Sequence, residues 1–484
     1  MGQIEKAKGK IGTLDFFCIG FGAIVGVGWA VFVNRWMANA GGPIPAASGY
    51  LMCLILLVPV ALCYAELVPM MPVAGGGAAF AYKAFGQNTA FISGWSAFGG
   101  FVLILPWEAI MVSSILAYAF PTFVMAGNPI YEIMGEAVYI PQIILGTLVA
   151  IMLFYINYKG TKGAASYQKI ITIIFLILGT STIVAAATHF NAENLMPLYE
   201  NVRNKPHTNF FGGVMSVMMM APFFLAGFET IPQAVEDAAG KVSSVGKTVV
   251  AAVAAACLYY AFALIGFGSA MPWEQFWFDL PFPAAGNLFP FIMPGGAGMF
   301  WYGVIIFVAL ISLTTTWNGF MIAAPRLLMG MGRANMIPKA FAKQHPKTNV
   351  PMAGLYASFV ISLTGPFLGL GLSDAITEVC AAGFVLSWAL TSSSALRLRL
   401  TEPETIRPYK MPGGIFMAGF AALMMWIFFI SFFIPGSPTF LGSFVIKFFL
   451  IWMAIGIALY LLAGPQRNAI PKEERAAELF RKNK

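Results

Sequence analysis

Long apolar runs, separated by short polar connections, fill most of the chain. A bilayer core of about 30 Å needs about 20 apolar residues in helical form, and twelve runs reach that length. The alternating segments of about ten residues that are typical of membrane β-barrels do not occur. The pattern predicts an all-α polytopic membrane protein with twelve transmembrane helices. The predicted spans are 13–37, 44–68, 88–120, 138–158, 166–188, 210–230, 247–271, 299–326, 352–371, 375–396, 414–434 and 441–463.

Basic residues are distributed unevenly between the two sets of loops. An even number of spans places both termini on one side of the membrane, and of the 28 Lys and Arg residues all but Arg35, Arg203, Lys205 and Lys447 fall on that side. Cytoplasmic loops carry an excess of Lys and Arg. We therefore expect a multi-pass protein of the plasma (inner) membrane with both termini in the cytoplasm.

Composition excludes several other classes of protein. Only 10% of the residues are charged and 59% are hydrophobic, whereas soluble domains have about 25% and about 45–50%. The excess of eight positive charges is dispersed among loops, which argues against nucleic-acid binding. The five cysteines lie in apolar runs and the three histidines are far apart, so no metal site or catalytic centre is expected. The expected partners are the lipid bilayer and a small molecule, no cofactor is expected, and the sequence does not indicate an oligomeric state.

Two predicted spans contain residues that interrupt helices. The first span has four glycines in the nine positions from Gly20 to Gly28, and the sixth contains Pro222 and Gly227. In lipid, non-helical backbone is tolerated only where it lines a cavity, and paired interruptions in two halves point to a midplane site of an inverted-repeat transporter. The alternative is that these glycines are packing notches between helices.

The breaks suggest a division of the chain into repeated halves. We expect a five-plus-five inverted repeat followed by two additional helices. The expected segments are a cytoplasmic tail at 1–12, repeats at 13–190 and 208–398, the last two helices at 412–464, and a C-terminal tail at 465–484 that is interfacial or disordered.

The same residues carry a family resemblance that runs through nearly the whole chain, and the sequence is similar to members of the amino acid–polyamine–organocation superfamily. The motifs are Gly22-Ala-Ile-Val-Gly26-Val-Gly28; Tyr64-Ala-Glu66 with Pro72-Val-Ala-Gly75-Gly76; Gly227-Phe-Glu229 with Glu236 and Asp237; and Trp317-Asn-Gly with Arg326, Arg333 and Ile337-Pro338. The resemblance implies the leucine-transporter-like fold, with helices one and six unwound at midmembrane, and transport by alternating access.

The resemblance also implies a set of substrate-binding positions. Backbone groups of the first break would bind a carboxylate, and Phe223 would close over the substrate. The sequence departs from the family at Val27, where many members have serine, and at Phe175, where several proton-coupled members have lysine. The expected binding residues are Gly22, Ala23, Ile24, Gly26, Val27, Gly28, Glu108, Phe223, Phe224, Ala226, Gly227 and Trp317.

Acidic and hydroxyl side chains inside spans are candidates for function, because a charge in the membrane is costly. Glu108 lies halfway along the third span and is expected to bind a substrate amino group, to carry a proton, or to be structural. Glu229 and Glu66 are expected to have structural or gating roles, Glu229 by pairing near the second and seventh spans. Thr315 and Thr316 either hold a coupling sodium ion or bond to their own helix. The coupling ion is left open between H+ and Na+.

Taken together, these patterns predict a secondary transporter for an amino acid or organic amine. The acidic side chain of Glu108 favours a substrate that carries a positive charge. A second indication comes from aromatic rings that could face a cation, those of Trp29, Trp107, Phe223, Phe224 and Phe228. The alternatives are a neutral amino-acid symporter or exchanger of the same fold, and a channel.

Overall fold

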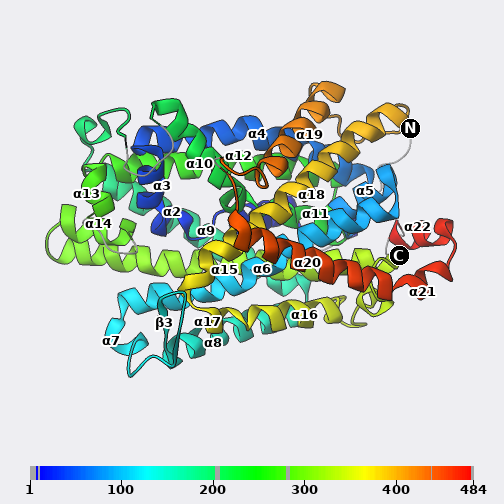
Figure 1. Cartoon of the computed structure of the whole chain (residues 1–484), viewed down its shortest axis with the longest axis horizontal. Helices are drawn as coiled ribbons and strands as arrows, with labels where there is room; N and C mark the ends of the chain where they lie inside the picture. Colours follow the sequence, from blue (N-terminus) through cyan, green and yellow to red (C-terminus); the bar gives the residue numbers. More distant parts are fainter. Residues whose placement is uncertain (1–6, 9–10, 202–207, 279–283, 438, 481–484) are drawn as a thin grey trace.

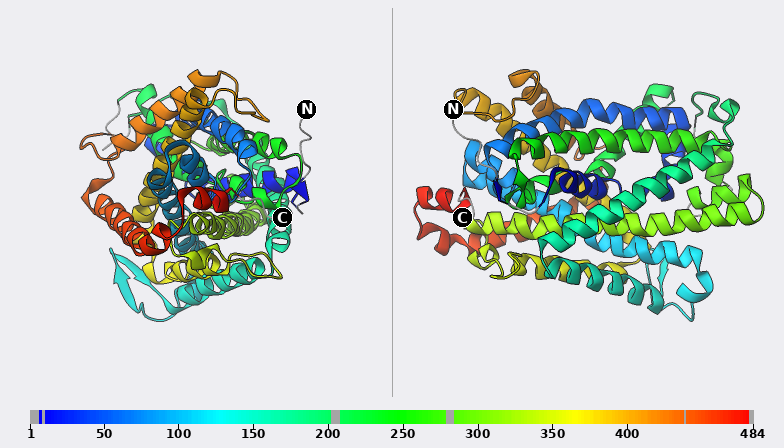
Figure 2. Two further views of the ribbon diagram at one scale, coloured as in Figure 1. Left: turned by 90° about the vertical axis from the view of Figure 1, so that its right-hand side faces the viewer. Right: turned by 180° about the vertical axis from the view of Figure 1, so that it is seen from behind.

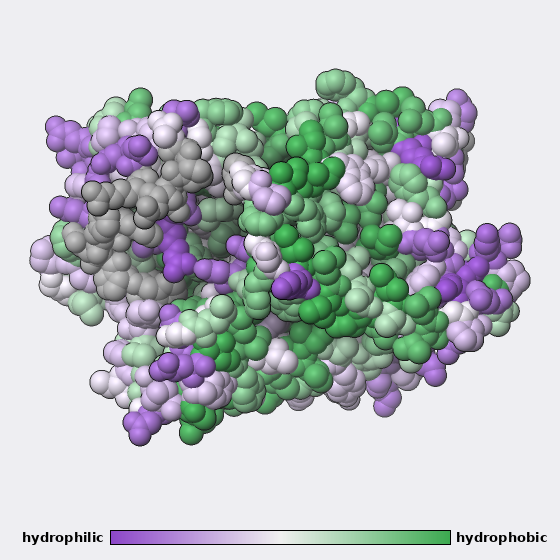
Figure 3. Space-filling view, viewed as in Figure 1, coloured by the Kyte–Doolittle hydropathy of each residue, from purple (hydrophilic) through white to green (hydrophobic). Residues whose placement is uncertain are grey.

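The protein is described by a computed structural model that covers residues 7–8, 11–201, 208–278, 284–437 and 439–480. Most helices run along the long axis of the molecule (Figure 1). A broad hydrophobic band covers the middle of the surface, and hydrophilic residues gather at both ends of the long axis (Figure 3). This arrangement fits a bundle that crosses a bilayer along its long axis.

Eleven helices of the described residues are long and apolar enough to cross a membrane. The predicted ninth span differs, because residues Met352–Leu368 form a shorter apolar helix that is interrupted after Ser362. The total of twelve therefore stays a prediction. The candidate spans are α1 (Thr13–Ile24) with α2 (Gly28–Val31), α4 (Pro43–Met70), α6 (Gln87–Ala119), α8 (Ile140–Tyr158), α9 (Thr161–Ala187), α10 (Phe210–Leu225) with α11 (Thr230–Gln233), α12 (Val242–Gly268), α15 (Gly296–Arg333), α18 (Ser373–Thr401), α19 (Gly414–Ser431) and α20 (Gly442–Leu462).

Short elements connect these spans. Two small antiparallel sheets, β1 with β4 and β2 with β3, were not predicted. The connecting elements are β1 (Ala7–Lys8), α3 (Val33–Ala40), α5 (Gly77–Phe85), α7 (Pro121–Val124), β2 (Tyr131–Ile133), β3 (Glu136–Val138), η1 (Ala192–Leu195), η2 (Val235–Asp237), β4 (Ala239–Gly240), α13 (Trp273–Phe278), α14 (Ala284–Ile292), η3 (Lys339–Ala342), α16 (Met352–Ser362), α17 (Gly365–Leu368), η4 (Leu370–Leu372), α21 (Gly464–Asn468) and α22 (Lys472–Leu479).

Burial separates central helices from peripheral ones. In α6, 94% of the residues in the 18-residue apolar stretch are buried inside the protein, compared with 22% in the corresponding stretches of α8 and α20. Helix α6 contacts α15 and α18, so a nearly encased helix carries Glu108 through the centre of the bundle. Apolar residues of α8 and α20 remain exposed, as expected for helices that face lipid.

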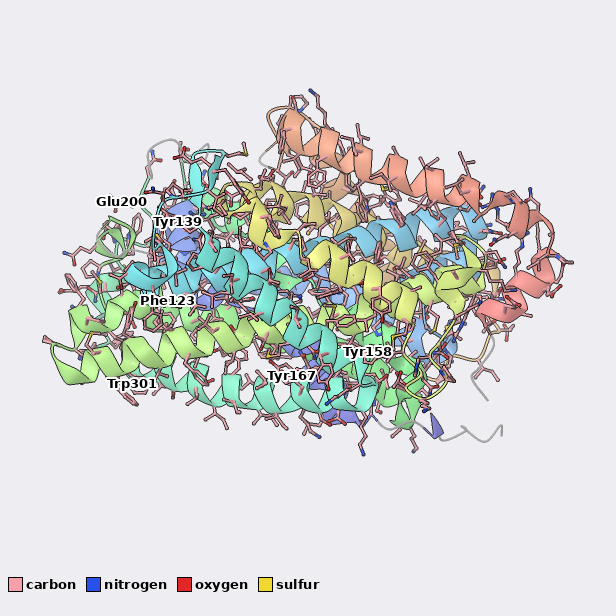
Figure 4. All side chains as sticks on the ribbon, turned by 90° about the horizontal axis from the view of Figure 1, so that it is seen from below. Phe123, Tyr139, Tyr158, Tyr167, Glu200 and Trp301 are labelled. Atoms are coloured by element: carbon pink, nitrogen blue, oxygen red, sulfur yellow. The ribbon has the colours of Figure 1, made fainter. Side chains whose placement is uncertain are left out.

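The two ends of the bundle carry different elements. Helices α13 and α14 lie at one end, and α22 lies at the other (Figure 1). Phe123, Tyr139 and Trp301 lie toward the α13 end (Figure 4), and the ring of Phe123 is exposed. Aromatic side chains favour the membrane–water interface, so these residues are placed to anchor that end.

Candidate substrate site

The first span is interrupted at the predicted glycines. Helix α1 ends at Ile24 and α2 begins at Gly28. The backbone N–H of Gly26 bonds back to the Ile24 carbonyl at 3.1 Å, and the Tyr260 hydroxyl donates to the same carbonyl at 3.2 Å. The break therefore takes the Ile24 carbonyl out of the α-helical hydrogen-bond pattern and gives it Gly26 and Tyr260 as partners, next to the start of a new helix.

The sixth span is also interrupted as predicted. Helix α10 ends at Leu225, Ala226 is extended, and α11 begins at Thr230. The carboxylate of Glu229 accepts a hydrogen bond from the Gly227 N–H at 2.7 Å and another from the indole N–H of Trp388. The N–H groups at a helix start have no partner within the helix. The Glu229 carboxylate provides a hydrogen-bond acceptor for the Gly227 N–H, which lies in the break.

The partner of Glu229 corrects one expectation. We expected Glu229 to pair with polar backbone near the second and seventh spans, whereas its hydrogen bonds come from the Gly227 N–H of its own break and from Trp388 of α18. The ring of Trp388 also stacks on Phe228, with centroids 5.3 Å apart. The contact depends on tertiary packing between residues far apart in the chain, which no local pattern encodes.

The two breaks lie against one another. Gly227 has a φ of +133°, and a Cβ atom built there would lie 2.6 Å from the carbonyl carbon of Ala23 and 2.7 Å from the nitrogen of Ile24. Only glycine adopts such a φ readily. Gly227 thus combines a strained backbone turn with close approach to the first break.

A cavity of about 20 Å³ lies between the breaks. That is roughly the space for one water molecule, so the walls are closed around the site and must move to admit a substrate. The lining residues are Ala23, Ile24, Gly26, Val27, Gly28, Ile104, Trp107, Glu108, Phe223, Phe224, Ala226, Tyr260 and Thr316.

Most of the expected binding residues meet at this cavity, and a few do not. Gly22, Gly227 and Trp317 are outside the described lining. Gly227 lies behind it against helix α1, and Trp317 is fully buried in α15. Trp29 stacks on Phe267, with centroids 6.2 Å apart, and is also outside the lining.

Glu108 provides the carboxyl group of the cavity. Its side chain is 1% exposed, and among the described residues its Oε2 atom has no hydrogen-bond partner. No Lys or Arg occurs in the described lining. A buried polar atom without a partner is costly, so Glu108 is available to bind a group that enters the cavity.

Four residues at or near the cavity were not predicted from the sequence, namely Ile104, Tyr260, Gln168 and Thr172. The first two line the cavity, whereas Gln168 and Thr172 lie against Gly22, where an added Cβ would be 2.7 Å and 2.4 Å from their side chains. Polar residues one turn apart within an apolar span were a signal that could have identified the latter pair. Phe175, at the family's lysine position, instead packs against Trp29, with centroids 5.9 Å apart.

The two threonines of α15 differ in their contacts. The Thr316 hydroxyl donates to the Gly22 carbonyl at 3.3 Å and lines the cavity. The Thr315 hydroxyl instead donates to the Ser312 carbonyl of its own helix at 2.7 Å. Thr316 therefore connects α15 to the first break, and Thr315 does not.

A larger hollow of about 420 Å³ lies beyond the cavity. Trp107, Phe223 and Phe224 line both spaces, and helix α3, which lines the hollow, packs against α13 and α14. We call this hollow the vestibule. Its charged lining residues are Arg35, Asp374 and Glu378. The three aromatic rings thus separate the cavity from a vestibule at the α13 end.

Ion pairs hold helices together at the α22 end. Arg333 pairs with Glu236 at 2.5 Å, and Arg326 pairs with Asp237 at 2.9 Å. These pairs join the end of α15 to the segment that follows α11. This side of the cavity is closed by charged contacts, whereas aromatic rings close the side that faces the vestibule.

Glu66 occupies a separate cluster at the same end. Its buried carboxylate accepts hydrogen bonds from Arg399, from Arg407 at 3.1 Å and from the Met411 N–H at 2.8 Å. The cluster joins α4 to the end of α18 and the segment after it. Glu66 does not line the cavity, so its contacts are structural.

Apolar spans with a central cavity between two broken helices define a membrane transporter. A family model described as amino acid permease matches residues 11–459, and the chain belongs to this family. It is a transporter of the amino acid permease class and not an enzyme.

Relatives that are named for different substrates resemble the chain. It is 24% identical over 476 residues to the branched-chain amino acid permease BcaP of Bacillus subtilis (strain 168), covering 96% of this chain and 95% of the relative. It is 25% identical over 419 residues to the aspartate-proton symporter of the same organism, covering 85% and 76%. It is 24% identical over 420 residues to the vacuolar cationic amino acid transporter 4 of Arabidopsis thaliana, covering 84% and 65%.

Proposed function

We propose that the protein is a secondary active transporter that moves an amino acid or organic amine across the plasma membrane by alternating access, with a cationic substrate favoured. The observation that carries this proposal is the Oε2 atom of Glu108, which is buried at the cavity between the two broken helices and has no hydrogen-bond partner in the described part of the chain.

The cavity offers complementary groups to such a substrate. The α-carboxylate would bind N–H groups where a helix begins at Gly28, and the α-ammonium would bind carbonyl groups where α1 ends at Ile24. A neutral amino acid would then leave Glu108 without a dedicated partner. A second cationic group would pair with it, and the rings of Trp107 and Phe223 would add cation–π contact.

The two sides of the cavity support alternating access. Aromatic rings separate it from the vestibule, and ion pairs close the α22 end. Opening each barrier in turn would carry a substrate across. Asp374 and Glu378 outnumber Arg35 among the charged residues of the vestibule, which favours the approach of cations.

The finer architecture belongs to the same proposal. We infer twelve spans in a five-plus-five inverted repeat, with the short helices α16 and α17 as part of the ninth, and both termini in the cytoplasm. The breaks in the first and sixth spans and the distribution of basic residues support this arrangement. Either H+, through Glu108, or Na+, through oxygens near Thr316, remains a candidate coupling ion.

Uptake into proteoliposomes tests the substrate. We expect saturable uptake of labelled lysine, faster when unlabelled lysine is inside, and weaker uptake of leucine. Glu108→Gln removes the negative charge at nearly constant volume and should lower lysine uptake at least tenfold. Glu132→Gln is the matched control, because Glu132 is exposed on the β2 strand. Full lysine uptake by Glu108→Gln would exclude the proposed contact.

A neutral amino acid is the second candidate, because apolar side chains such as Val27 and Ile104 form much of the cavity wall. Leucine uptake that exceeds lysine uptake and survives Glu108→Gln would favour it. Ion conductance without saturation or exchange would instead identify a channel.

A further inference from the structure

The C-terminal helix α22 docks on the bundle, although its polar sequence predicted an interfacial or disordered tail. Arg475 is 7% exposed and Leu479 is fully buried. The Arg475 guanidinium donates from Nη1 to the Gln87 side chain at 2.6 Å, at the first residue of α6. The ring of Phe480 contacts Tyr82 of α5, with centroids 6.2 Å apart. One face of α22 is thus buried against the bundle, with contacts to α5, α6 and α15.

The same helix contacts a second part of the bundle. Glu478 pairs with Lys339 at 3.5 Å, and the Lys339 N–H donates to Gln466 of α21 at 3.3 Å. Lys339 begins η3, the next element after α15, which ends at Arg333. Viewed from this end, α22 lies across the end of the bundle near α15 (Figure 2, left). Helix α22 therefore bridges α5 and the turn that follows α15.

Both bridged elements hold the segment after the sixth-span break. The turn before α5 donates two hydrogen bonds to it, from the Gly75 N–H to Gln233 at 3.0 Å and from the Ala74 N–H to Glu236 at 2.8 Å. From the other side, Arg333 at the end of α15 pairs with Glu236. The segment Gln233–Glu236 is consequently held between two elements that α22 ties together.

We propose that α22 is a latch that keeps the α22 end of the transporter closed. While α22 is docked, α5 and the α15–η3 turn cannot separate, and the inner segment of the sixth span stays between them. Release of α22 lets these elements move apart, so this end of the cavity opens more often. A partner or modification that competes for the buried face of α22 would regulate transport without touching the substrate site.

Hydrogen–deuterium exchange of the full-length protein in detergent or nanodiscs tests the latch. Arg475→Ala and Leu479→Ala remove the buried contacts, and Lys472→Ala, at an exposed position of the same helix, is the matched control. We expect exchange to rise at least threefold in residues 74–80 and 230–237 of the two latch variants and to be unchanged in Lys472→Ala. Exchange in α13 and α14, at the opposite end, should not change.

A second variant separates docking from folding of the helix. Gln87→Ala removes the partner of Arg475 from α6 and leaves the sequence of α22 intact. Gln87→Ala should raise exchange in residues 230–237 as Arg475→Ala does. The double variant should match either single variant, because each substitution removes the same Arg475–Gln87 hydrogen bond. An exchange increase confined to 472–480, or one of equal size in Lys472→Ala, would overturn the proposal.

The latch rests on the proposed alternating access but not on the identity of the substrate. The exchange measurement needs no substrate, so its outcome is independent of the lysine assay. In the uptake assay, whichever substrate is transported, the latch variants should change the transport rate at least twofold, and Lys472→Ala should not.

Discussion

Gly227 lies against the backbone of Ala23, where the two broken helices meet. A Cβ atom at Gly227 would approach the Ala23 carbonyl carbon to 2.6 Å. The two interruptions are therefore mutually dependent, since the turn in one fits only against the backbone of the other.

Replacement of Gly227 by alanine should disrupt both breaks. The backbone strain of a non-glycine residue at this φ costs about 1–3 kcal/mol, and the clash with Ala23 adds to it. We expect a lower thermal unfolding midpoint and loss of uptake. Gly303→Ala in helix α15, where an added Cβ meets no atom within 4 Å, should leave both unchanged or slightly raise the midpoint.

Glu229 is expected to maintain the sixth-span break. In Glu229→Gln one carboxylate oxygen is replaced by an NH2 group, which donates and cannot accept, so the hydrogen bond from either the Gly227 N–H or the Trp388 indole is lost. Loss of a buried hydrogen bond to a charged group costs about 1.5–3 kcal/mol. Uptake and thermal stability should both fall, as they should in Trp388→Phe. Strictly additive effects in the double variant would contradict a shared role.

Glu66 is expected to be more important for stability than an exposed carboxylate at the same end. Glu66→Gln leaves Arg399 and Arg407 without their buried counter-ion, which costs about 3–5 kcal/mol. Glu402→Gln, which breaks an exposed pair with Lys83, should cost less than about 1 kcal/mol. Thermal unfolding of the purified variants compares the two. Equal midpoints would show that the Glu66 cluster contributes little.

Thr316 is expected to matter for transport where Thr315 does not. Thr316→Val removes the hydrogen bond to Gly22 at the first break, whereas Thr315→Val removes a bond within α15. We expect a severalfold loss of uptake in the first variant and a near-normal rate in the second. Measurement with and without sodium adds the coupling ion to the test, because a sodium dependence that disappears in Thr316→Val would place the ion there. Similar rates for both variants would remove any special role of Thr316.

Local sequence features predicted the interruptions of the helices, but not what packs around them. Glycines from Gly20 to Gly28 and the Pro222–Gly227 segment lower helix propensity where they stand, and the helices end beside them. The partners of these breaks come from distant spans: Tyr260 for Ile24, Trp388 for Glu229. Such contacts depend on how helices are arranged around each other, which hydropathy does not encode.

The sequence by itself determined that this protein lies in a membrane, that its first and sixth spans are broken, and which acidic residue is buried at its centre. Hydrophobic length and the conformational limits of glycine and proline act within a few turns of helix, so they can be read along the chain. Only the tertiary structure decided that Gly227 turns against Ala23, that Gln168 and Thr172 lie against Gly22, and that α22 docks across one end. Those outcomes arise from the packing of side chains between segments that are remote in sequence, where a small shift in helix rotation selects a different partner.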